Sequence, residues 1–451
     1  MRRSILLFVL STTVGASLKA QNEGLLEKVN PLGTDSGGFR LQNVSVFMTY
    51  YSVAPEQSYT TGIGSLKSDT AVGAAASLGY TKFGERSSTS FVYAASYTER
   101  LRYSGNAVNH SLSLNWRRNL TPKWSFNFSA SGSASSISDT LLTSTALGKV
   151  VGTSATFEEF TSAIVTGKST NNQLAAILTN APIIESPTGL QLYGSRALTA
   201  SVQSGITYFK SNRLRFYATG VVNRSQPLND FGASTGVRSP YLIAQTTGVT
   251  ANVGIGYSVS PRTQLNVDVT STRTVSNFQD TYTSTGNVGV ARTMGMNWFV
   301  QVHGGTVIIT SVRQSASLPS GLQYQAGGSI GYKTRTHTFM ADVERMATDS
   351  YGYGAAASLA ATGAWSWKRP SNPWRISANF AQQWLNGSRT LNINSWRATG
   401  EVGRMLGRNM TLSAQYAYLS DLRFVGSGAY GGQHILRVSL NWVPGAKGIM
   451  P

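Results

Sequence analysis

The chain has 451 residues, of which 13% are charged, and its 38 lysines and arginines outnumber its 19 aspartates and glutamates to give a formal net charge of +19. Charged residues make up about 25% of an ordinary soluble protein, so this composition argues against a soluble globular domain. The absence of cysteine excludes a secreted fold stabilised by disulfides, and the spread of basic residues without a cluster argues against nucleic acid as a partner.

The N-terminus reads MRRSILLFVLSTTVGASLKAQN. Arg2 and Arg3 precede an apolar run that ends at small residues, a pattern typical of a secretory signal peptide over residues 1–20. This run is too short for a spanning helix, and no later run reaches the roughly 18–20 apolar residues that a membrane helix needs. Any membrane association must therefore come from strands. We expect residues 21–38 to form a periplasmic segment ahead of the first strand.

Apolar and polar residues alternate with period two from the run at 41–52 to the run at 435–442. In the stretch TPKWSFNFSAS, for example, Trp124, Phe126 and Phe128 alternate with small polar residues. Such alternation indicates a strand whose two faces meet different surroundings.

Short turn signals separate these runs, mostly at intervals of about 35–39 residues, which is room for two strands, a tight turn and a longer loop. Eight such hairpins, together with the first and last runs, predict eighteen strands with an uncertainty of two. The strands are expected over residues 39–443, with a tail at 444–451. The longer connections are predicted at 53–69, 103–108, 137–195, 225–244, 275–284, 311–320, 347–352, 385–391 and 420–432.

The tryptophans indicate which face of the strands meets lipid. They lie near the ends of the strands on the apolar face, as is typical of the two aromatic girdles of a transmembrane barrel. The other face is small or polar, which suits a water-filled lumen because a dry core would leave many polar groups unpaired. The predicted fold class is therefore all-β, a transmembrane antiparallel up-and-down barrel with short periplasmic turns and longer extracellular loops. The girdle residues are Trp116, Trp124, Trp298, Trp367, Trp374, Trp384, Trp396 and Trp442.

In strand number and in its connections, the sequence resembles the large Gram-negative outer-membrane β-barrels, in particular the porin-like channels of about eighteen strands. One local motif adds to the likeness: LRVSLNW is similar to the final strand that the assembly machinery reads in that family, with Leu436, Val438, Leu440 and Trp442 on one face. The family usually ends at that aromatic residue, whereas VPGAKGIMP follows it here. The resemblance implies a Gram-negative outer-membrane location. Its implied partners are outer-membrane lipid, lipopolysaccharide and the barrel-assembly machinery, and an oligomer is allowed. No metal is expected, because the four histidines are scattered and no pair has ligand spacing, and passive diffusion needs no cofactor.

Basic residues recur on the inward face of the predicted strands, whereas the inward acids are fewer, mainly Asp268, Asp342, Glu344 and Glu401. A lumen with excess positive charge would concentrate anions and repel cations. The competing interpretation makes many of these residues solvated rim residues or contacts to anionic lipid. The candidate pore-lining basic residues are Arg100, Arg102, Arg117, Arg215, Lys333, Lys368, Arg375, Arg397 and Arg437.

The connection at 137–195 is far longer than its neighbours, and loops of this length are usually functional or disordered. Folded into the lumen, it would form a constriction with Glu158 and Glu159 facing the basic wall. Outside the lumen, it would form an extracellular cap. The sequence leaves both arrangements open.

The leading hypothesis is a porin-like outer-membrane channel for passive passage of small hydrophilic, preferentially anionic solutes. The alternatives are an exporter of an acidic exopolysaccharide and a structural or adhesive surface barrel, although inward Phe47, Phe209 and Phe299 are too few to fill a wide lumen. An enzyme is not expected, because the G-x-S-x-G match at 327–331 lies mid-strand, where a nucleophile elbow cannot form. A soluble propeller has repeats of similar length, but its repeats hold four strands rather than two.

Overall fold

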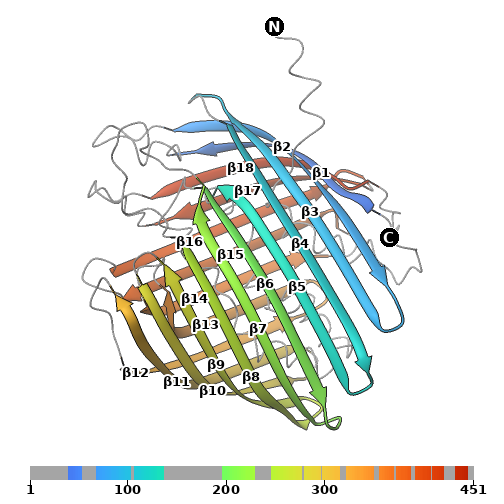
Figure 1. Cartoon of the computed structure of the whole chain (residues 1–451). Helices are drawn as coiled ribbons and strands as arrows, with labels where there is room; N and C mark the ends of the chain where they lie inside the picture. Colours follow the sequence, from blue (N-terminus) through green and yellow to red (C-terminus); the bar gives the residue numbers. More distant parts are fainter. Residues whose placement is uncertain are drawn as a thin grey trace.

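The protein is one closed antiparallel sheet of eighteen strands, as the computed structural model shows (Figure 1). Each strand pairs with its neighbours along the chain, and β1 (Phe39–Tyr51) pairs with β18 (Gln433–Trp442) to close the ring. The predicted fold class and strand number are confirmed. The structure describes residues 39–52, 68–102, 106–136, 196–228, 245–276, 279–295, 297–314, 321–349, 355–369, 372–386, 392–407, 409–420 and 432–444.

The strands are long, mostly thirteen to sixteen residues, and strongly tilted in the barrel (Figure 1). Among the described residues, no helix is long and apolar enough to span a membrane. The strands between β1 and β18 are β2 (Asp69–Phe83), β3 (Ser87–Arg100), β4 (Asn106–Thr121), β5 (Trp124–Ser136), β6 (Arg196–Phe209), β7 (Leu214–Pro227), β8 (Thr246–Ser260), β9 (Thr263–Ser276), β10 (Gln279–Met294), β11 (Trp298–Gln314), β12 (Gly321–Lys333), β13 (His337–Asp349), β14 (Ala355–Lys368), β15 (Trp374–Asn386), β16 (Asn392–Met405) and β17 (Met410–Leu419).

The closing seam is regular, since β1 and β18 pair from Val44↔Trp442 to Tyr51↔Ile435 without a shift. Because β1 and β18 pair with each other, neither terminal strand is an open edge of the sheet, which hydrocarbon would not tolerate.

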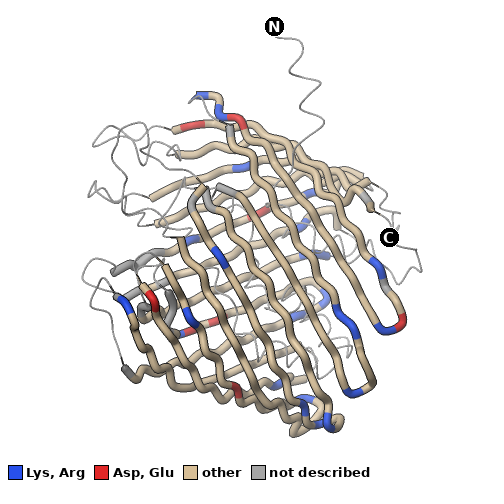
Figure 2. The backbone as a smooth tube through the Cα atoms, viewed as in Figure 1, with Lys and Arg blue, Asp and Glu red and all other residues tan. Residues whose placement is uncertain are grey.

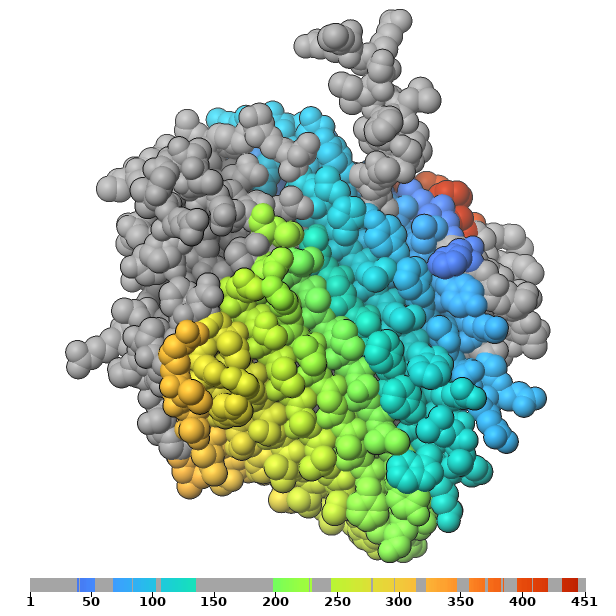
Figure 3. Space-filling view, viewed as in Figure 1, coloured from blue at the N-terminus to red at the C-terminus, as the bar shows by residue number. Residues whose placement is uncertain are grey.

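Burial across the sheet is inverted relative to a soluble protein. Val253 and Val302 are 55% and 57% exposed on the outer face, whereas Asn266 and Glu344 are each 1% exposed on the inner face. An apolar outer surface of this extent is unfavourable in water and favourable in lipid. The outer faces of β3 to β8 lie side by side and form one continuous surface (Figure 3). The apolar face predicted from the alternation therefore faces outward.

A hydroxyl or amide side chain caps five of the short connections. Thr121 Oγ1 accepts hydrogen bonds from the backbone nitrogens of Lys123 and Trp124, at 3.2 and 3.1 Å. Ser211, Ser260, Thr334 and Asn372 make equivalent contacts in their own turns. Such side-chain caps are a known determinant of tight turns. Gly295 and Gly407 supply the positive φ, 64° and 134°, in two further turns.

One connection on the other side of the barrel is shorter than predicted. The sequence places a loop at 275–284, but β9 runs to Ser276 and β10 starts at Gln279. Arg273 binds Asp280 across this hairpin through two hydrogen bonds, Nε to Oδ1 at 3.0 Å and Nη2 to Oδ2 at 2.8 Å. The Thr-rich strands here favour continued pairing. The predicted long loop at 137–195, with Glu158 and Glu159, lies outside the described residues, as do the segments at 1–38 and 445–451.

Candidate functional site

The inner wall of the barrel carries the candidate functional groups. Period-two alternation directs every second side chain of each strand inward, and the register between strands sets which of these side chains meet. Charged residues line the strands unevenly (Figure 2). The inner wall of β9 to β13 holds three carboxylates and a histidine, and we call these residues, Asp268, His303, Asp342 and Glu344, the acidic sector.

Asp268 is the acceptor for a set of amides on adjacent strands. Its carboxylate accepts hydrogen bonds from Asn266 Nδ2 at 3.2 Å, Asn252 Nδ2 at 3.4 Å and Asn287 Nδ2 at 3.5 Å. Asn266 also donates to the Tyr217 hydroxyl, at 2.7 Å. This network crosses four strands of the inner wall and holds a buried carboxylate by neutral donors rather than by a cation.

His303 and Glu344 contact each other although a strand lies between them. His303 Nε2 and Glu344 Oε1 are 2.9 Å apart, on β11 and β13. Gly327 of β12 pairs with both residues, and a Cβ there would overlap the Glu344 carboxylate and crowd the His303 ring. The glycine therefore lets the two side chains lie flat along the wall and meet above it.

The same arrangement recurs on the inner wall. Tyr217 of β7 crosses Gly254 of β8 to reach Asn266 of β9. Arg375 of β15 lies over Gly403 of β16. By contrast, Cβ atoms added at Gly220, Gly286 and Gly400 on the outer parity would meet nothing within 4 Å. Inward glycines thus hold long polar side chains against the wall and out of the barrel axis.

The predicted basic residues differ in their position and burial. Arg215 and Arg437 are buried on the inner wall, at 4% and 3% exposure. Arg437 Nε donates to Thr49 Oγ1 across the closing seam at 2.9 Å, and its guanidinium carbon lies 4.5 Å from the Phe47 ring centroid. Arg397 is half-buried on β16, and Arg100 is half-buried at the end of β3.

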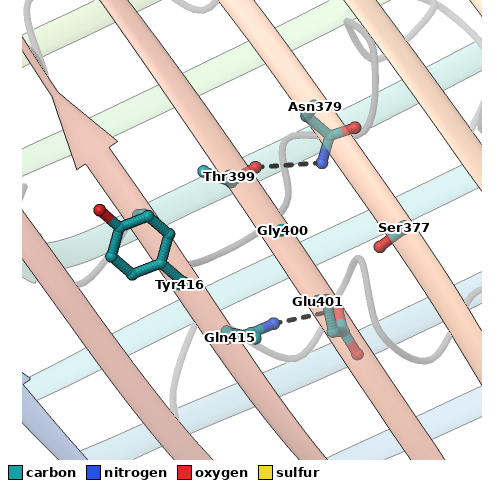
Figure 4. Close-up of a pocket in the computed structure, with 8 residues that line it drawn as sticks. Ser377, Asn379, Thr399, Gly400, Glu401, Gln415 and Tyr416 are labelled. Carbon is teal, nitrogen blue, oxygen red and sulfur yellow. Dashed lines mark hydrogen bonds between the residues drawn. The ribbon is translucent and has the colours of Figure 1, made fainter.

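Arg375 is paired rather than free. Its Nη2 lies 2.9 Å from Glu401 Oε1, and Gln415 Nε2 donates to Glu401 Oε2 at 3.1 Å. Glu401 and Gln415 line a small polar pocket with Ser377, Asn379 and Thr399 on β15 to β17, while Tyr416 points away from them (Figure 4). Among the described residues, no group of three His, Asp or Glu side chains is placed to bind a metal ion.

Three of the predicted basic residues lie at the short-turn end of the barrel rather than at mid-height: Arg117, Lys333 and Lys368. Arg102 is exposed beyond the end of β3, where its Nη1 donates to the Ser68 carbonyl oxygen at 3.3 Å. The three short-turn residues belong to a larger set that the sequence reasoning did not single out. We call it the basic rim, and each of the eight short turns contributes at least one Lys or Arg. Several of these residues gather at the short-turn end of the near strands in Figure 2. Its members are Lys82, Arg86, Arg117, Arg118, Lys123, Lys210, Arg213, Arg262, Arg292, Lys333, Arg335, Lys368, Arg369 and Arg404.

Glu85 is the only acidic residue of this rim in the part of the chain that the structure describes. The sequence alone indicates the basic rim, because each predicted turn carries or adjoins a Lys or Arg. The concentration of cations at one end became visible only when the turns were placed together.

The tryptophans lie on the outer face at both ends of the strands. Trp124, Trp298, Trp374 and Trp442 are exposed near the short turns, and Trp116 and Trp367 are half-buried there. Trp124 packs against Tyr208 at 4.7 Å between ring centroids, and Trp298 against Tyr332 at 4.5 Å. At the opposite end, half-buried Trp384 and Trp396 lie on β15 and β16.

No protein-family model matches the sequence, and no curated protein matches it. Solved structures with a similar barrel include a BenF-like porin from Pseudomonas fluorescens, with a TM-score of 0.45 and 10% identity over 91% of this chain and 99% of that chain. OccK9 (OpdG) of Pseudomonas aeruginosa aligns with a TM-score of 0.43 and 10% identity over 90% and 98% of the two chains. OpdK of the same species, in a structure with vanillate, aligns with a TM-score of 0.41 and 9% identity over 89% and 97%. At these identities the likeness is one of fold.

Proposed function

We propose that this protein is a channel of the Gram-negative outer membrane through which small hydrophilic solutes, preferentially anions, diffuse without covalent chemistry or cofactor. The observation that carries the proposal is the closed ring of eighteen strands with a polar inner face. Natural barrels of 16–18 strands are too wide for their own side chains to fill and leave an aqueous channel. Glu344 Oε2 and Asn266 Oδ1 have no protein hydrogen-bond partner among the described residues, which favours a hydrated interior.

The preference for anions rests on the balance of charge along the path. The basic rim surrounds one mouth of the barrel, and Arg215, Arg397 and Arg437 add positive charge to the inner wall. A mouth lined by one sign of charge raises the local concentration of the opposite ion. The acidic sector opposes this effect over β9 to β13, so we expect a moderate preference rather than strict selectivity.

The same inner wall weakens the export hypothesis. Passage of an acidic polysaccharide is favoured by a continuous series of cations with few acids, whereas Asp268, Asp342 and Glu344 interrupt the wall at mid-height. Phe47 and Phe299 are buried on the inner face and Phe209 is half-buried, which is little aromatic volume for a filled structural barrel.

The same proposal implies how the barrel is placed in the outer membrane. The outer aromatic residues would lie at the two lipid interfaces, in contact with outer-membrane lipid and lipopolysaccharide. Leu436, Val438 and Trp442 are exposed on the outer face of β18, at 45%, 40% and 44%, where the assembly machinery could read them with Leu440. A constriction by residues 137–195 stays a prediction, and an oligomer stays allowed.

Conductance and reversal potential in a planar bilayer under a KCl gradient test the proposal. We expect steady single-channel conductance and a reversal potential of the sign that chloride permeation gives. A potassium preference would overturn the assignment of the charged residues but leave the barrel intact. Folded protein that conducts nothing would overturn the channel itself.

A further inference from the structure

The basic rim has a feature that a channel does not need. Lys82, Arg118, Arg292 and Arg404 lie on the outer parity of β2, β4, β10 and β16 and are exposed. Their side chains are directed away from the lumen and toward the surroundings of the barrel. We call these four residues the outer cations.

Each outer cation lies two residues after an apolar residue on the same face of its strand. Arg118 follows Trp116, Lys82 follows Tyr80, and Arg404 follows Val402. Two residues along a strand span about 6.6–6.8 Å, so the outer surface changes from apolar to cationic within the depth of a headgroup layer. Arg404 also lies over the Trp374 ring, 5.2 Å from its centroid, which places the cation directly beside an interfacial aromatic residue.

The opposite end of the outer face differs. Arg273 is paired there with Asp280 at 2.8 Å, and Arg345 stacks on Tyr324 with its guanidinium carbon 3.8 Å from the ring centroid. Glu99 adds an exposed acid. No ion pair within the described part of the chain involves Lys82, Arg118 or Arg292. The outward positive charge of this end is therefore partly balanced by the outward carboxylates Asp280 and Glu99, whereas the outer cations have no ion pair of this kind among the described residues.

We propose that the outer cations bind the phosphate groups of anionic phospholipids in the leaflet that faces the short turns. The sites repeat around the barrel, so the headgroup contacts surround it. Each Lys or Arg near an anionic lipid surface strengthens binding about fivefold. The contacts lie at the solvent boundary, and salt therefore weakens them.

Native mass spectrometry of the full barrel, released from mixed micelles with equal amounts of phosphatidylglycerol and phosphatidylcholine, measures this preference. We expect the wild type to retain phosphatidylglycerol over phosphatidylcholine, and Lys82→Gln/Arg118→Gln/Arg292→Gln/Arg404→Gln to reduce the ratio at least fivefold. The charge-preserving variant Arg118→Lys/Arg292→Lys/Arg404→Lys should keep it. Heat-dependent mobility on a gel checks that each variant is folded.

Arg224→Gln/Arg345→Gln is the matched control, since it removes outward cations at the other end of the strands. An unchanged lipid ratio in the quadruple variant, or an equal loss in this control, would overturn the proposal. A further experiment measures capture of poly-glutamate by the barrel in zwitterionic nanodiscs. If the wild type shows no lipid preference but captures poly-glutamate, and Lys123→Gln/Lys210→Gln/Arg213→Gln loses this capture, the rim binds a soluble polyanion instead.

Discussion

Replacing Gly327 with alanine isolates the contact between His303 and Glu344. The added Cβ would overlap the Glu344 carboxylate, whose far side is held 2.9 Å from His303 Nε2. The side chains of His303 and Glu344 are only 12% and 1% exposed, so solvent screens this contact little. Loss of a hydrogen bond to a charged group costs about 1.5–3 kcal/mol, and overpacking costs about 1–3 kcal/mol. We expect the free energy of unfolding to fall by about 2.5–6 kcal/mol in total.

Urea unfolding of the barrel in lipid vesicles, followed by tryptophan fluorescence, measures this loss. Gly400→Ala is the matched control, because a Cβ at Gly400 meets nothing within 4 Å and the variant should unfold like the wild type. In a Glu344→Ala background the clash with the carboxylate is absent, and the His303 ring that the Cβ still crowds has lost its carboxylate partner, so the cost of Gly327→Ala should fall well below its value in the wild type. A cost that persists in full in that background, or a Gly327→Ala barrel as stable as the wild type, would refute the reasoning.

Three further predictions concern the inner wall. Replacing Asp268, Asp342 and Glu344 with their amides removes the negative charge of the acidic sector, so the reversal potential in a KCl gradient should shift toward chloride, whereas Glu99→Gln on the outer face should leave it unchanged. Arg437→Gln breaks the charged hydrogen bond to Thr49 across the closing seam and should lower the free energy of unfolding by about 1.5–3 kcal/mol; an unchanged urea midpoint would contradict this role. Deletion of residues 140–190 should raise single-channel conductance, and an unaltered conductance would favour an extracellular cap over a constriction.

The strand number and the inward or outward direction of each side chain were predictable because both follow from local pattern. Trp124 points outward and Ser125 inward because successive side chains of a strand point to opposite faces of the sheet. The tight turns were predictable too, since hydroxyl residues such as Thr121 and Ser211 form their caps within a few residues of sequence.

The partners of the inner side chains were not predictable, because they depend on register between strands that are far apart in sequence. Nothing in the sequence links His303 to another charged group, and Gly327 lies only in the discarded G-x-S-x-G match at 327–331. The pairing of β11 with β12 and of β12 with β13 brings both to Glu344. The short connection at 277–278 was missed for a related reason, because the Arg273–Asp280 pair forms only when β9 and β10 extend beyond the predicted strand ends.

The net charge of +19 is unevenly distributed over the barrel. Much of the positive charge lies on the short-turn rim, whereas the mid-height wall of β9 to β13 is acidic and Arg375 is paired with Glu401. Charges at an exposed rim act on passing ions only within a Debye length of about 8–10 Å in ordinary salt. Buried wall charges such as Arg437 are screened much less. In the proposed channel we therefore expect the rim and the wall to make separable contributions to ion selectivity, and a single value of net charge describes neither.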